Sequence, residues 1–158
     1  MSRQGREIAI QHGQRLPSFN SQLEADTALF AHRDRHLALL SELAEGYPGF
    51  EPDYRPESLK ALERWYFSLY EGRTFRRVGV TRQTFEMCMA MYFGETVVRN
   101  RPAHWIVEKY FLAEDRYELG IQDGSMKMML DRLTDHFAEP NNKRRESLFR
   151  RYEKYFPS

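Results

Sequence analysis

Two features of this chain combine residue types that could do chemistry: a pair of histidines and a carboxylate inside an apolar segment. His32 and His36 lie four residues apart, a spacing that places two imidazoles on one face of a helix, where they could share a metal ion. Arg33 and Arg35 lie between them and would repel a cation. The glutamate that follows the first histidine in metallopeptidase helices is absent. A solvated helix face is the favoured interpretation, and we predict no metal and no cofactor. The remaining histidines, His12, His104 and His136, show no ligand spacing.

Glu95 is the acidic residue best suited to acid–base catalysis, because burial in an apolar helix raises the pKa of a carboxyl group. Arg99 follows one helical turn later, in the acid-then-base order that favours an ion pair. Catalysis also needs a second polar group and a pocket. Pairing of Glu95 with Arg99 or with hairpin backbone is the favoured interpretation, so no catalytic residue is predicted. An enzyme centred on Glu95 is an alternative that requires a pocket at the junction of helix and hairpin.

Gly94 interrupts the same apolar run. A glycine within a helix costs about 1 kcal/mol relative to alanine, so a helix that keeps one usually needs another element close to its backbone. The expected neighbour is the hairpin that opens at Trp105. The predicted structural centre of the fold is therefore Gly94, Glu95, Arg99 and Trp105.

Acidic residues gather around the predicted hairpin. Such an edge suits a basic partner, where charge complementarity raises the association rate and the specificity. It equally suits protection of an edge strand against aggregation. The candidate interaction residues are Glu108, Glu114, Asp115, Glu118 and Asp123.

Basic residues gather at the end of the chain, interleaved with aromatic residues at helical spacing. This combination is compatible with a nucleic-acid surface and also with a packed helix whose arginines face solvent. The candidate basic patch comprises Lys143, Arg144, Arg145, Arg150, Arg151 and Lys154.

Hydrophobic periodicity predicts an α+β fold of about five helices, with a small antiparallel hairpin packed on a central buried helix. Residues 1–20 are expected to form a flexible arm ahead of a single domain, 21–158. Helices are predicted over 21–44, 56–71, 82–100, from Ser125 through Phe137, and over 143–156. Strands are predicted over 104–110 and 116–122, and residues 77–80 are compatible with another short strand. The helix over 82–100 is apolar on nearly all sides and should be the most buried.

Composition limits the classes of protein that fit. The 158 residues are 41% hydrophobic and 14% aromatic, enough to bury a core and too aromatic for a disordered chain. The net charge of +1 gives no overall bias toward nucleic acid or anionic lipid. Cys88 is the only cysteine, so no intramolecular disulfide forms. No segment has the length of a membrane span or a signal peptide, and a cytoplasmic protein is expected.

The string Tyr92-Phe93-Gly94-Glu95, followed by Trp105 on a strand, resembles a group of small, uncharacterised bacterial proteins. These share a Y-[FL]-G-E helix ahead of a W-[IV] strand, and some resemble immunity proteins of polymorphic toxin systems. The resemblance covers residues 85–125 and implies that Gly94, Glu95 and Trp105 define the fold. It implies no catalytic role for them.

These observations favour a non-enzymatic protein of the bacterial cytoplasm that binds a protein partner. An immunity or antitoxin-like protein that occludes its partner is the leading hypothesis, since no catalytic constellation is present and the charges alternate in blocks along the chain. The alternative is a nucleic-acid-associated protein that uses the basic final helix.

Overall fold

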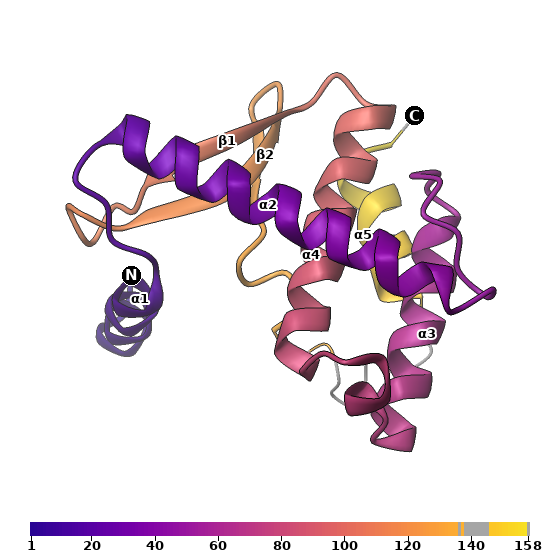
Figure 1. Ribbon diagram of the computed structural model, residues 1–158. Coiled ribbons are helices and arrows are strands. Elements are labelled where there is room, and N and C mark those ends of the chain that lie inside the picture. Colours follow the sequence, from indigo (N-terminus) through magenta and orange to yellow (C-terminus); the bar gives the residue numbers. More distant parts are fainter. Residues whose placement is uncertain (136, 138–145, 158) are drawn as a thin grey trace.

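The computed structural model describes residues 1–135, 137 and 146–157 (Figure 1). Within this part of the chain, five α-helices and one short 3-10 helix accompany a three-stranded antiparallel sheet, which confirms the predicted α+β, mainly helical fold. No helix among these residues is both long and apolar enough to cross a membrane. The elements are α1 (Arg3–Arg15), α2 (Gln22–Glu45), α3 (Ser58–Gly72), η1 (Phe75–Val78), α4 (Arg82–Asn100), β1 (His104–Lys109), β2 (Tyr117–Asp123), β3 (Met126–Met129) and α5 (Ser147–Tyr155).

Helix α4 is the centre of the fold and has the predicted bounds. The Thr81 hydroxyl caps it by accepting a hydrogen bond from the Thr84 amide at 3.1 Å, and the helix ends just before Pro102. Helices α2, α3 and α5 and strands β1 and β2 all contact it, and α2 crosses both α4 and the sheet (Figure 1). Because neighbours surround α4, its apolar residues lie on nearly every side of the helix.

An aromatic core joins α3 to α4. Trp65 is fully buried, with the Tyr47 ring stacked on it at 4.7 Å and the Phe85 ring packed edge-on at 4.9 Å. Cys88 lies in the same core, where burial raises the pKa of its thiol to about 12. Cys88 therefore packs as a small apolar residue.

Gly94 is the point at which the sheet reaches α4. A Cβ atom at Gly94 would lie 2.5 Å from Cη2 of Trp105 and 2.5 Å from Cδ1 of Leu130. Trp105 belongs to β1 and Leu130 follows β3 directly, so both outer strands of the sheet are anchored at one backbone position.

Strand β3 replaces the helix predicted from Ser125 through Phe137, and that prediction is wrong. The two residues Gly124 and Ser125 connect β2 to β3, with Asp123 opposite Met126 and Gly124 at a φ of +60°. A glycine at the first of the two loop residues suits a tight hairpin turn, because that position takes a positive φ, and Gly124-Ser125 therefore continues the sheet into a third strand. The first hairpin agrees with prediction, with His104 of β1 opposite Gln122 of β2.

The N-terminal residues also differ from prediction, because helix α1 occupies much of the expected arm, 1–20. The Ser2 hydroxyl caps α1 by accepting from the Gly5 amide at 3.0 Å. Gly13 lies flat against the Tyr110 ring, and the Tyr110 hydroxyl donates to the Ala9 carbonyl at 2.7 Å. Tertiary contacts thus hold a helix whose sequence has almost no apolar stripe.

Two smaller predictions need correction. Residues 77–80, predicted to be compatible with a strand, lie at the end of the 3-10 helix η1, which stops at Gly79 with a φ of +84°. The final helix begins at Ser147, because Glu146 adopts the left-handed conformation with a φ of 54°. Positions 143–145 of the predicted helix lie outside the described residues.

Glu63 is a buried carboxylate that joins α3 to α5. Its Oε1 atom accepts a hydrogen bond from the Ser147 amide at 3.0 Å, and its Oε2 atom has no hydrogen-bond partner among the described residues. Burial raises the pKa of Glu63 from 4.5 to about 6, with Glu146 raising it further and the Ser147 hydrogen bonds and Arg150 lowering it.

We expect Glu63→Gln to change how stability depends on pH. The folded state holds the Glu63 proton more tightly than the unfolded chain, so the cost of the buried charge is absent below pH 4.5 and complete above about pH 6. Between about pH 4.5 and 7, the variant should therefore gain about 1–2 kcal/mol relative to wild type. Urea unfolding at both pH values measures this gain, and exposed Glu51→Gln is the control. A pH-independent difference would contradict the assignment.

Gly94→Ala should destabilise the protein by about 1–3 kcal/mol, because the new methyl group overlaps Trp105 and Leu130. Gly46→Ala is the matched control, since a Cβ atom there comes no closer than 3.7 Å to Leu43 O. Equilibrium unfolding in urea compares the two variants with wild type. Equal stability of both would show that Gly94 is not required for close packing.

Candidate functional site

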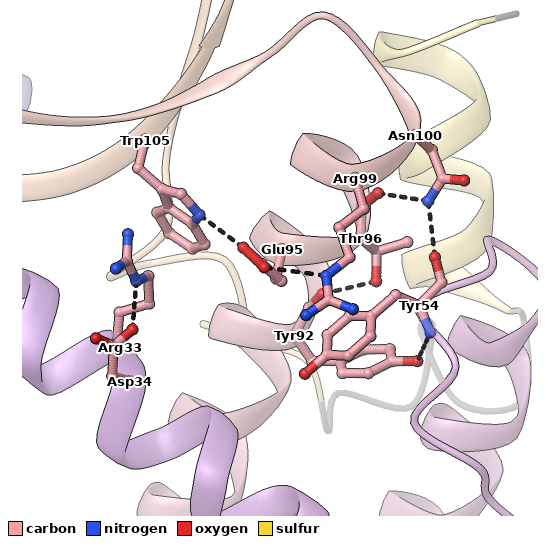
Figure 2. A network of polar contacts seen from close by, with 9 residues as sticks. All are labelled: Arg33, Asp34, Tyr54, Tyr92, Glu95, Thr96, Arg99, Asn100 and Trp105. Atoms are coloured by element: carbon pink, nitrogen blue, oxygen red, sulfur yellow. Dashed lines mark hydrogen bonds and ion pairs between the residues drawn. The ribbon is translucent and has the colours of Figure 1, made fainter.

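Glu95 has a partner for each of its carboxylate oxygens (Figure 2). The Trp105 indole N–H donates to Oε1 at 3.0 Å, and the Arg99 Nε donates to Oε2 at 3.1 Å. The alternative of an enzyme centred on Glu95 requires a pocket at this junction of α4 and β1. The geometry instead gives Glu95 a positioning role, because it fixes the side chain that packs on Gly94.

The network continues from Arg99 to the loop before α3 (Figure 2). The Arg99 guanidinium lies 3.7 Å from the centre of the Tyr54 ring. Asn100 donates to the carbonyls of Tyr54 and Thr96, each at 2.7 Å, and the Tyr92 hydroxyl accepts from the Tyr54 amide at 2.9 Å. These contacts hold Tyr54 at a positive φ of 59° against the C-terminal half of α4.

The two histidines on α2 have different surroundings, since His36 contacts its own helix whereas His32 lines the cavity described below. The Nδ1 atom of His36 lies 2.8 Å from the His32 carbonyl oxygen, and the two rings are tilted at 4.3 Å. Burial lowers the pKa of His32 to about 4, with His36 and Arg35 lowering it further. Within the described residues, His32 and His36 belong to no group of three potential metal ligands.

The five acidic candidates do not form one continuous charged surface. Glu108 pairs with Lys127 and Asp123 pairs with Arg101, at 4.0 Å in the second case. Asp115 lies 3.8 Å from Arg116 and accepts from the Ser18 hydroxyl at 2.6 Å, which lowers the pKa of Asp115. Glu114 is exposed in the turn between β1 and β2, whereas Glu118 lines a cavity.

Only part of the basic patch can be placed, since Lys143, Arg144 and Arg145 lie outside the described residues. Arg151 donates to the Leu133 carbonyl at 2.8 Å, and the Lys154 ammonium lies 5.2 Å from the Tyr155 ring centre. Arg150 is exposed. Arg151 is thus used to anchor α5.

A cavity of about 550 Å³ lies among helices α1, α2 and α4, strand β2 and the segment after β3. Its floor is apolar, with Leu29, Met87 and Leu119 among the lining residues. Polar groups gather at its rim, where His12, Glu118 and Asp131 approach one another.

These three residues form a compact polar cluster. His12 Nε2 lies 3.0 Å from Asp131 Oδ2, and one ligand atom from each of the three residues falls within 4.8 Å of the others. Burial raises the pKa of Glu118 to about 7, Asp131 and Glu108 raise it further, and Arg132 lowers it. Burial also raises the pKa of Asp131, against the opposing effect of His12.

Sequence reasoning identified only Glu118 of this cluster, and placed it in an acidic edge. His12 comes from α1, Glu118 from β2 and Asp131 from the segment after β3. No local spacing joins them, so no motif search would find them. The sequence carries only an indirect signal for this cluster. A hairpin turn at Gly124 extends the sheet by a third strand, and this strand brings Asp131 to the edge of the sheet.

Comparisons with known proteins give a family but no activity. The family model described as "Uncharacterised protein YwmA" matches residues 18–156. The chain is 27% identical, over 113 residues, to the uncharacterised protein YwmA of Bacillus subtilis (strain 168), covering 71% of this chain and 71% of that relative. No solved structure matches the chain. The expected resemblance to small uncharacterised bacterial proteins is confirmed at this level.

We predict an energetic coupling of about 1–2 kcal/mol between Trp105 and Glu95, because their hydrogen bond has a charged acceptor. A double-mutant cycle with Trp105→Phe, Glu95→Met and the double variant measures it by urea unfolding, because methionine is close in size to glutamate and has no oxygen to accept the indole N–H. The cycle removes the effect of the smaller phenylalanine ring, which both variants carrying Trp105→Phe share. A coupling near zero would mean that Glu95 does not fix Trp105.

Proposed function

The chain belongs to the YwmA family of uncharacterised proteins, and we propose that it is a non-enzymatic protein that binds a protein partner. The proposed docking surface is the hairpin end, defined as the turn between β1 and β2 (110–116) together with α1 and the first turn of α2. An immunity or antitoxin-like role, in which this surface occludes a toxic partner, is the form of the proposal that agrees with the resemblance in the sequence.

The observation that carries the proposal is where the large apolar side chains are exposed. Phe111 in the turn is 69% exposed and Leu23 at the start of α2 is 76% exposed. Ile8 and Ile10 are exposed on α1. Tyr155 is also exposed, but it lies on α5, away from the hairpin end. Exposed aromatic and aliphatic residues that gather on one part of a folded protein mark interaction sites.

Two parts of the hairpin end, the turn between β1 and β2 and the start of α2, are held in place by hydrogen bonds between segments. The Phe19 amide donates to the Asp115 carbonyl at 2.9 Å, and the Gln22 side chain donates to the Val107 carbonyl at 2.9 Å. A preformed surface loses less conformational entropy on binding than a mobile one. The anchors Phe111 and Leu23 are therefore presented on fixed backbone.

The acidic residues of the turn limit the kind of partner surface that would fit there. Glu114 is exposed beside Phe111, and the Asp115 side chain is 63% exposed. The hydrogen bond from Ser18 lowers the pKa of Asp115 and so keeps this carboxylate ionised. At the turn itself, the complementary surface is an apolar socket with basic groups at its edge, which gives rapid and specific association.

The test is capture of the partner by matched surface variants. Tagged wild-type protein and the variants Phe111→Ser, Leu23→Ser and Tyr155→Ser are incubated with lysate of the source organism, in parallel with and without nuclease, at 50 and 200 mM salt. We expect wild type and Tyr155→Ser to retain the same stoichiometric protein, and Phe111→Ser and Leu23→Ser to lose it.

Two results would contradict the proposal. Equal capture by all four proteins would place the interface elsewhere. Recovery of nucleic acid that disappears at the higher salt, with no protein retained after nuclease, would favour the basic final helix. Circular dichroism of each variant confirms that a lost partner does not reflect lost folding.

A further inference from the structure

Three potential metal ligands meet at the rim of the cavity, each from a different element. His12 is on α1, Glu118 on β2 and Asp131 in the segment after β3, and one ligand atom from each lies within 4.8 Å of the other two. Three ligands at bond lengths typical of tetrahedral zinc are about 3.4 Å apart. Movements of less than about 1 Å therefore bring all three atoms onto one ion.

The polar atoms of this cluster are buried without hydrogen bonds. His12 Nε2 and both carboxylate oxygens of Asp131 have no hydrogen-bond partner within the described part of the chain. The 3.0 Å contact between His12 and Asp131 does not have the alignment of a hydrogen bond. Water has little access to this contact, because the two side chains are only 13% and 20% exposed. Buried polar atoms normally find partners, and unpaired ones call for an unseen water or ion.

We propose that His12, Glu118 and Asp131 bind one divalent cation of the zinc class. A neutral imidazole and two carboxylates carry a charge of −2, which one such ion balances. Imidazole nitrogen selects a transition metal over Mg²⁺ or Ca²⁺, which prefer oxygen ligands alone. Three protein ligands leave a further coordination position for water or for a molecule in the cavity.

Three arginines among the described residues line the same cavity. Arg132 acts on both carboxylates of the cluster and lowers the pKa of each, while its Nε atom is 3.1 Å from Asp135 Oδ2. Arg15 and Arg35 also line the cavity. They favour anionic groups in the remainder of the cavity, so a bound ion would sit at its acidic rim and an acidic ligand beside it.

The experiment is metal titration of the full-length, tag-free protein after removal of metal by EDTA and dialysis. Isothermal titration with ZnCl₂, and separately with MgCl₂, measures stoichiometry and affinity. We expect one Zn²⁺ per chain and much weaker Mg²⁺ binding. His12→Gln and Asp131→Asn should each weaken Zn²⁺ binding at least about tenfold, because even the loss of a group that supports a ligand has an effect of this size.

Matched controls locate the ion. His104→Gln removes an exposed histidine, and Glu108→Gln removes the acid opposite Glu118, so both should bind Zn²⁺ as wild type does. Loss of binding in His36→Gln but not in His12→Gln would assign the ion to the histidine pair on α2 and overturn the proposal. Absence of Zn²⁺ binding by the folded wild-type chain would overturn it as well.

A second readout follows the position of α1. An ion held by His12 ties α1 to β2, so Zn²⁺ should slow tryptic cleavage after Arg3, Arg6 and Arg15 in wild type and leave it unchanged in His12→Gln. This variant alters a side chain on a helix that buries little apolar surface, so it should fold. Protection that is equal in wild type and His12→Gln would contradict a bridging ion.

Discussion

The missing side chain at Gly94 is the constraint on which the arrangement of sheet and helices depends. Trp105 and Leu130 occupy the space that a Cβ atom would need, and they anchor the two outer strands to the same turn of α4. Glu95, the next residue, bonds to the Trp105 indole and so sets the orientation of that ring. One turn of α4 thus fixes both the distance of the sheet from the helix and its rotation about that contact.

Three buried or half-buried carboxylates, Glu63, Glu95 and Asp131, differ in how fully their hydrogen-bonding capacity is used. Both oxygens of Glu95 have partners, one oxygen of Glu63 has a partner, and neither oxygen of Asp131 has a hydrogen bond within the described residues. A carboxylate buried without hydrogen bonds is destabilising, so a fold that retains one generally uses it. The number of hydrogen bonds to each carboxylate thus distinguishes the structural role of Glu95 from the proposed binding role of Asp131. The residues that surround each acid in the sequence do not make this distinction.

The elements predicted well are those whose signals are local. Thr81 and Pro102 mark the two ends of α4, and the alternation in residues 116–122 marks β2. Strand β3 was missed because a glycine after a strand can end a sheet or begin the next hairpin. Helix α1 was missed because contacts with distant residues, Tyr110 and Asp131, hold it. The cluster of His12, Glu118 and Asp131 could not be predicted, since three non-adjacent elements assemble it.

Helix α1 is attached less stably than the rest of the fold. Its only buried residue is Gly13, and its attachment consists of ring packing on Tyr110, one tyrosine hydroxyl bond and the contacts of His12. Segments with so little buried apolar area open locally at a free energy far below that of global unfolding. Because α1 forms one wall of the cavity, local opening of this helix uncovers the cavity contents without movement of the aromatic core.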